Sequence, residues 1–238
     1  MTAALDRPVE LHQHHRDVNG GWLRPASFGI MDGLVSNLCL VTGVVGGGAS
    51  THTVVITGLA GLAAGACSMA VGEFTSVSSQ AELIEAEIAV ERRELQRKPV
   101  EEERELAHTF ERKGISPKLA GEVARELSAN HEEAWRTHVR EELGVDPDDL
   151  PSPWVAASAS FLSFALGAVV PLLPFLLGAT ALLPALLVAA VALFGTGGLI
   201  ARLTARPIWF GGGRQLLLGA LSAAVTYSVG LLVGTGLG

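Results

Sequence analysis

Two acidic residues and a methionine lie within apolar parts of this sequence, where charge is otherwise rare. Asp32 and Glu73 are the only acids between Arg24 and Gln80, and Met69 precedes Glu73 by four residues. A carboxylate inside a membrane span is energetically expensive unless it faces water, a partner or an ion, so such residues mark functional sites. The four-residue spacing puts Met69 and Glu73 on one helix face. We therefore predict an ion path that uses Asp32, Met69 and Glu73.

The ligand chemistry of these side chains favours a divalent transition metal. A hard carboxylate oxygen with a softer thioether suits Fe(II) better than Mg(II) or Ca(II). Neutral oxygens could come from Ser36, Asn37 or Ser68. Carboxylates also take up and release protons, which allows metal and proton fluxes to be coupled. The alternatives are a hydrogen bond between helices for the two acids and ordinary packing for the methionine.

A second group of candidate ligands lies in the charged middle of the chain, residues 80–149. This stretch holds 16 glutamates and three aspartates against 11 lysines and arginines, a local net charge of −8. Carboxylates three or four residues apart share a helix face and can bind one cation, and an imidazole is typical of transition-metal sites. A solvated, salt-bridged helix surface explains the same charges equally well. The candidate pairs are Glu91 with Glu94, Glu102 with Glu105, and His138 with Glu142.

Helices must position these side chains, because the apolar runs are long and continuous. The chain has 238 residues and a mean hydropathy of +0.39, and its apolar runs are long enough to cross a bilayer. Strands of an outer-membrane barrel would alternate instead. We predict an all-α, polytopic membrane protein with five transmembrane helices, and the absence of a basic patch argues against nucleic-acid binding. The expected spans are residues 25–48, 53–79, 153–177, 180–203 and 213–237.

The sequence between the second and third spans predicts a solvated helical domain. Helices are expected at about 80–98, 100–113, 117–129 and 131–143, because proline or glycine punctuates each junction and each helix carries a sparse apolar stripe. The sequence PLLP at 171–174 should bend or break the third span near its far end. The expected organisation is an N-terminal segment at 1–23, spans one and two at 24–79, the acidic helical domain at 80–150, and spans three to five at 151–238.

The charges of the connecting segments predict the orientation. The short links between spans one and two, and between three and four, contain no lysine or arginine, whereas the N-terminal segment and the link between spans four and five contain several. Under the positive-inside rule, the N-terminus, the acidic domain and the link between spans four and five are cytoplasmic and the C-terminus is outside. The basic residues concerned are Arg7, Arg16, Arg24, Arg202, Arg206 and Arg214.

The N-terminal segment is polar and does not have the apolar core of a signal peptide. It contains His12, His14 and His15, which could contact a metal. A polar tail is the commoner explanation for such a cluster.

Four motifs make the chain resemble the vacuolar iron transporter family in its bacterial form. They are DGLVSNLCLVTGV at 32–44, AAGACSMAVGEFTSVSSQ at 63–80, VREELGV at 139–145 and GAVVPLLP at 167–174. The resemblance covers nearly the whole chain from about Phe28 onward. It implies a homodimer of five-span subunits with the ion path at the dimer interface. It also implies export of Fe(II), with Mn(II) as a further substrate, in exchange for protons, without a permanently bound cofactor. For such an exporter, we expect the membrane to be the cell's inner (plasma) membrane.

By the same resemblance, Asp32 corresponds to the family's pore aspartate and Met69 to its pore methionine. The glutamates on either side of Pro99, together with one before Gly144, correspond to a cytoplasmic site that collects metal. The residues that this assigns to the cytoplasmic site are Glu91, Glu94, Glu102, Glu105 and Glu142.

Two positions depart from the family pattern. Gly61 stands where the plant-type pattern has a second-span glutamate, and we expect Glu73 to take over that acidic role. His138 and Val139 stand where the family has paired methionines. Of these two, His138 is able to act as a ligand and Val139 is not.

A different function is a non-transporting membrane scaffold whose acidic helices bind a cytoplasmic partner. Such a scaffold has no need to bury Asp32 and Glu73 in the membrane, which favours the transporter. An enzyme is disfavoured, because no Ser/His/Asp or Cys/His set and no phosphate-binding glycine loop is evident.

Overall fold

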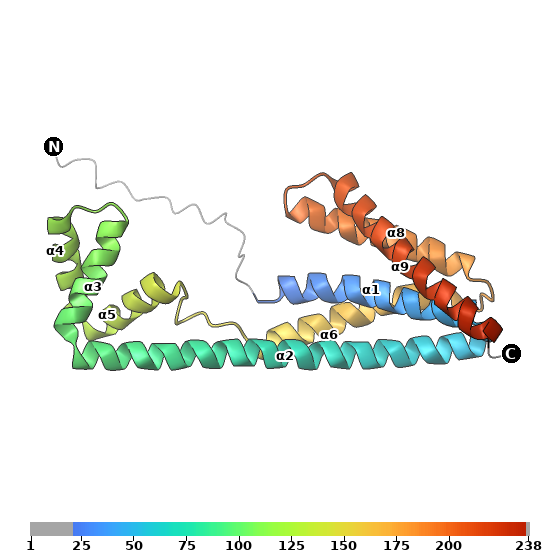
Figure 1. Ribbon diagram of the computed structural model, residues 1–238, viewed down its shortest axis with the longest axis horizontal. Helices are drawn as coiled ribbons and strands as arrows, with labels where there is room; N and C mark the ends of the chain where they lie inside the picture. The colour runs from blue at the N-terminus through green and yellow to red at the C-terminus, as the bar shows by residue number, and fades with distance from the viewer. Residues whose placement is uncertain (1–20, 237–238) are drawn as a thin grey trace.

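The computed structural model describes residues 21–236, and this part of the chain is helical with short connections and no strand (Figure 1). The prediction about His12, His14 and His15 lies outside the described residues. Five helical segments are long and apolar enough to cross a membrane, which confirms the prediction of an all-α chain with five candidate spans. They are α1 (Leu23–Gly46), α2 (Thr51–Arg97), α6 (Pro153–Val169) with its continuation to Leu176, α8 (Leu183–Leu203) and α9 (Ile208–Gly236).

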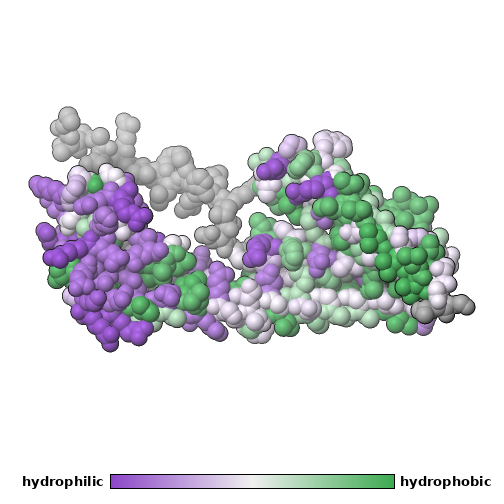
Figure 2. Space-filling view, in the orientation of Figure 1, coloured by the Kyte–Doolittle hydropathy of each residue, from purple (hydrophilic) through white to green (hydrophobic). Residues whose placement is uncertain are grey.

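Helix α2 runs the length of the molecule and connects its apolar and acidic parts (Figure 1). Its 47 residues extend about 70 Å at 1.5 Å per residue, whereas the hydrocarbon core of a bilayer is about 30 Å thick. Helix α2 is therefore much longer than one membrane crossing requires. Hydrophilic residues gather around α3 to α5 at one end of the molecule and hydrophobic residues around α8 and α9 at the other (Figure 2).

The acidic middle of the chain folds as a small helical unit against the end of α2. Its elements are α3 (Pro99–Arg112), α4 (Pro117–Ser128), α5 (His131–His138) and a π-helical turn (Val139–Leu143), close to the ranges that proline and glycine predict. Its core is formed by Leu95 of α2 with Ala134, Trp135 and Val139. Because the acidic unit begins within α2, no flexible linker separates it from the second span.

Proline interrupts the third span as predicted. Helix α6 gives way to a 3₁₀ turn at Val170–Leu172 and a short helix α7 at Leu173–Leu176. The tight turn follows from Pro171, which has no backbone N–H to continue the α-helical pattern.

The fifth span begins earlier than predicted. Helix α9 starts at Ile208, so Arg214 lies inside it, and Arg202 lies in the last turn of α8. Gly211 and Gly212, which precede the predicted start at residue 213, are buried where α9 packs on α8. Of the three arginines assigned to this link, Arg206 alone lies between the two helices.

Helices α1 and α6 pack so closely that glycines on each helix contact the backbone of the other. A Cβ atom at Gly33 would collide with the backbone of Phe164, and one at Gly167 would collide with the backbone of Ile30. Lipid provides no hydrophobic drive for helix association, so close packing through small residues supplies much of the attraction.

We predict that Gly167→Ala lowers stability, since its methyl group must push α1 away from α6. Overpacking of this kind costs about 1–3 kcal/mol, or about 2–4 °C in unfolding midpoint for each kcal/mol. The measurement is thermal unfolding of the detergent-solubilised protein. Gly195→Ala on α8 is the matched control, because a Cβ there meets nothing within 4 Å. Equal midpoints for the two variants would contradict the proposed packing.

Candidate metal sites

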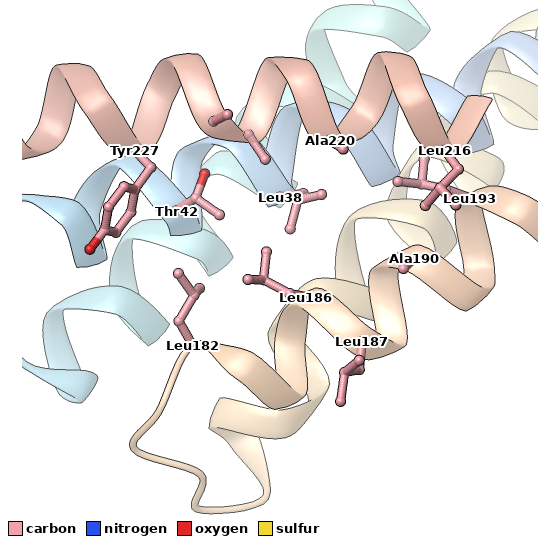
Figure 3. Close-up of a pocket in the computed structure, with 12 residues that line it drawn as sticks. Leu38, Thr42, Leu182, Leu186, Leu187, Ala190, Leu193, Leu216, Ala220 and Tyr227 are labelled. Carbon is pink, nitrogen blue, oxygen red and sulfur yellow. The ribbon is translucent and has the colours of Figure 1, made fainter. Parts of the chain in front are cut away.

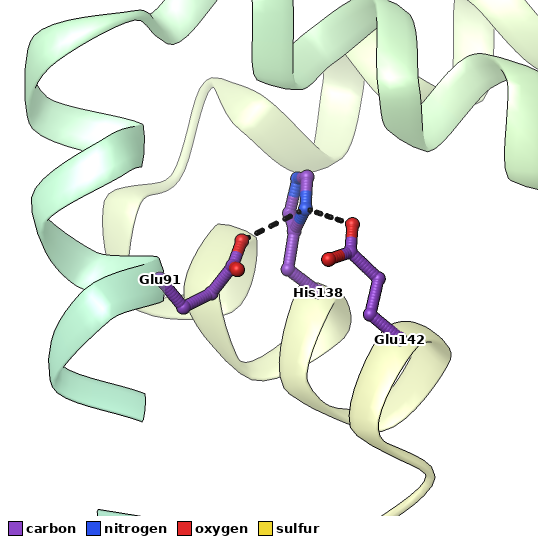
Figure 4. Close-up of side chains that lie close together, drawn as sticks. All are labelled: Glu91, His138 and Glu142. Atoms are coloured by element: carbon purple, nitrogen blue, oxygen red, sulfur yellow. Dashed lines mark hydrogen bonds and ion pairs between the residues drawn. The ribbon is translucent and has the colours of Figure 1, made fainter. Parts of the chain in front are cut away.

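A buried histidine forms the centre of the acidic unit (Figure 4). The Nδ1 atom of His138 lies 3.1 Å from Glu91 Oε1, 3.1 Å from Glu142 Oε1 and 3.9 Å from Glu102 Oε2. These four residues come from α2, α3, α5 and the π turn, so the site exists only when the helices are assembled. We call this group the acidic site.

Local structure explains how these residues meet. Pro99 begins α3 directly after α2 ends, and this corner brings the buried side chains of Glu91 and Glu102 to the same interior. Glu142 lies four residues after His138, in the π turn that Gly144 ends with a left-handed φ of 67°. Single π turns inside helices are frequently found at functional sites.

The acidic site has more negative charge than its own residues neutralise. The Nδ1 atom of His138 carries at most one proton, and it hydrogen-bonds to Glu142. Among the described residues, the buried Oε1 of Glu91 pairs only with the Nδ1 atom that Glu142 also shares, and the buried Nε2 of His138 has no hydrogen-bond partner. One ligand atom each from Glu91, His138 and Glu142 lies within 4.8 Å of the others, a spacing that a single cation can bridge.

Three side chains of the acidic site hold protons more tightly than they would in water, because their pKa values are raised. Burial raises the pKa of Glu102 and of Glu142, and the negative charge of Glu91 raises both further. For His138, burial lowers the pKa, but the carboxylates of Glu91 and Glu142 outweigh it and raise the pKa overall. A metal ion that binds here must therefore displace protons.

The structure separates the predicted glutamates into two groups. Glu91, Glu102 and Glu142 lie within 3.9 Å of His138, and of these three only Glu142 is exposed. Glu94 and Glu105 are exposed and form no ion pair with His138. Glu105 lines an adjoining hollow with Glu142, and Glu94 and Glu105 raise the pKa of Glu102 through their charge alone.

A second candidate site lies between the membrane-length helices. Asp32 of α1 and Met69 of α2 line one cavity of about 280 Å³, which we call the membrane cavity. Gly65 makes room for the ring of Phe164 from α6, which forms one wall. No sequence motif points to Phe164, because its contact with α2 depends on the tertiary packing. The remaining lining residues are Ser36, Asn37, Leu40, Gly61 and Ser68.

Glu73 lies in a different cavity from Asp32 and Met69. It lines a hollow of about 560 Å³ between the start of α1, the middle of α2 and the link at residues 144–152. We call this the junction cavity, because it lies where the apolar and acidic parts meet. One helical turn along α2 separates Glu73 from Met69, so the two residues share a helix face without sharing a cavity.

A third cavity, of about 510 Å³, lies between α1, α8 and α9 and is lined almost entirely by leucine and alanine (Figure 3). Its polar side chains are Thr42 and Tyr227. The hydroxyl of Thr42 already bonds to the Cys39 carbonyl at 3.0 Å and to Thr226 at 2.9 Å. This lining does not supply the ligands that a divalent cation needs.

Known proteins resemble this chain along most of its length. A family model described as the VIT family matches residues 23–231. "Vacuolar iron transporter" of Acanthamoeba castellanii is 35% identical over 229 residues, covering 92% of this chain and 82% of the relative. "Vacuolar iron transporter 1" of Oryza sativa subsp. japonica is 31% identical over 231 residues, covering 94% and 91%. "Vacuolar iron transporter homolog 1" of Arabidopsis thaliana is 34% identical over 217 residues, covering 90% and 84%.

We predict that divalent metal binding at the acidic site weakens as the pH falls and releases protons. The raised pKa values of Glu102, Glu142 and His138 mean that protons compete increasingly as the pH drops from 8 to 6. Calorimetry of the full chain with Mn(II), in buffers of different ionisation enthalpy, measures both the affinity and the protons released.

His138→Gln should reduce the number of protons released at neutral pH, whereas Glu126→Gln on α4 is the control because that carboxylate is exposed. Binding that is independent of pH, or equal proton release in both variants, would refute the assignment of His138 to the site.

Proposed function

The chain belongs to the VIT family, and we propose that it exports Fe(II) from the cytoplasm in exchange for protons, with Mn(II) as a further substrate. The relatives named above as iron transporters support iron as the cargo. They also agree with a transporter rather than an enzyme. The alternative of a non-transporting scaffold gains no support from these relatives.

The observation that carries this proposal is the membrane cavity. It is lined by both a carboxylate and a thioether among three membrane-length helices, and Asp32 has no salt-bridge partner among the described residues. An ionisable group in such a place is costly unless it serves an ion or proton path. Oxygen with sulfur is a ligand pair suited to Fe(II), and the carboxylate is able to accept the counter-transported proton.

We further propose that the acidic site collects the ion before it enters the membrane. Its negative charge attracts divalent cations, and helix α2 connects it without a break to Met69. The junction cavity lies between the two sites, and its carboxylates at Glu73, Asp146 and Asp149 suit it to an entry vestibule. In this role Glu73 lies on the ion path, and the ion reaches Glu73 before it reaches Asp32.

The proposed organisation follows from this order of events. The N-terminal segment (1–23) and the acidic domain (80–150) are cytoplasmic, spans lie at 24–79 and 151–238, and the C-terminus is outside. We propose the plasma membrane as the location and a homodimer as the working unit. The relatives are named as vacuolar, and in both membranes the ion would leave the cytoplasm.

We predict that the purified chain in liposomes moves Fe(II) with a counterflow of protons, and that Asp32→Ala and Met69→Leu reduce the rate severely. Removing either ligand leaves the ion inadequately coordinated in the cavity. A metal-quenched dye and a pH dye inside the vesicles measure the two fluxes. Met31→Leu is the matched control for Met69→Leu, because Met31 does not line the membrane cavity.

Wild-type rates in Asp32→Ala and Met69→Leu would contradict the assignment of the membrane cavity as the ion path. Metal movement without any proton flux would reject the coupling while leaving the path intact.

A further inference from the structure

Asn37 is a deeply buried polar residue whose hydrogen-bonding capacity is only half used. It is 2% exposed, and its Nδ2 donates to the backbone carbonyl of Ala168. Its Oδ1 is buried and has no hydrogen-bond partner among the described residues. An unsatisfied buried acceptor is destabilising, so a site that retains one calls for a physical explanation.

The orientation of this amide is fixed by its partner. A backbone carbonyl can only accept, so the NH₂ end of Asn37 must face Ala168. That carbonyl needs a side-chain donor because Pro171, three residues later, has no N–H to offer within the 3₁₀ turn. The break in the third span therefore holds Asn37 with its oxygen turned away from α6.

The free oxygen faces α2 across the membrane cavity. Asn37 lines this cavity together with Asp32 and Met69. A Cβ atom built on Gly61 of α2 would lie 3.4 Å from Oδ1 and would collide with the side chain of Leu40. The absence of a side chain at Gly61 therefore lets α2 approach Asn37 Oδ1 and Leu40 closely.

We propose that Asn37 Oδ1 is a further ligand of the transported divalent metal ion, beside the carboxylate of Asp32 and the thioether of Met69. The inference rests on the proposed function, because it assigns a ligand to that same path. A neutral oxygen adds coordination without adding a second negative charge. Such a site binds the ion and still lets it leave, as conduction requires.

The test compares initial Fe(II) transport rates of proteoliposomes over a range of Fe(II) concentrations. Loss of even an indirect supporting group at a metal site costs about 10–100-fold in affinity, so Asn37→Leu should raise the half-saturating concentration at least about tenfold. Asn37→Asp keeps an oxygen of similar reach but adds a second negative charge, so its half-saturating Fe(II) concentration should be no higher than that of the wild type and its maximal Fe(II) rate should fall. Its harder ligand should raise the Mn(II) rate relative to the Fe(II) rate.

Thr42→Val is the matched control on the same helix. Thr42 is also buried and also bonds to another span, through Thr226, but it lies outside the membrane cavity. It should leave the half-saturating concentration unchanged, even if the maximal rate falls.

A purely structural role for Asn37 gives a different result. Asn37→Leu would then lower only the maximal rate, with an unchanged half-saturating concentration, and this outcome overturns the ligand assignment. Should Asn37→Leu not fold, an unchanged Mn(II)-to-Fe(II) rate ratio in Asn37→Asp overturns it. Failure of the wild type to transport Fe(II) would overturn the proposed function and this inference together.

Discussion

A carboxylate removed from water needs a compensating positive charge, and both candidate sites of this chain are built around that requirement. In the acidic unit, three carboxylates surround the single imidazole of His138, which can neutralise only one of them. In the membrane part, Asp32 lines a cavity whose other polar groups are neutral. Desolvated charge of this kind is stabilised by cations or by protons. The same physical property therefore underlies both the proposed metal binding and the proposed exchange with protons.

The continuity of α2 determines how the two sites relate to each other. One helix carries Met69 in the membrane cavity, Glu73 in the junction cavity and Glu91 in the acidic site. An uninterrupted helix fixes the spacing and the facing of these side chains, which a flexible linker would not do. Close packing of α1 on α6 then holds the opposite wall of the membrane cavity in place.

Helix boundaries were predictable because proline and glycine act locally. Pro99 and Gly144 mark corners that follow from backbone chemistry alone. The sequence could not show which glutamates are the metal-ligand candidates, because residue spacing shows which side chains share a helix face but not which face is buried. Asn37 illustrates the same limit, since its importance depends on a carbonyl 131 positions away in the chain. The predicted start of α9 was too late, because Gly211 and Gly212 belong to the helix and are buried against α8.

Anomalous diffraction at the iron absorption edge, from crystals of the full chain grown with Fe(II), tests the central claim most directly. The account predicts one iron peak beside His138 in the acidic site. It predicts a second peak in the membrane cavity, within bonding distance of the Asp32 carboxylate and the Met69 sulfur. Iron at the acidic site, with none in the membrane cavity at saturating Fe(II), would contradict the account.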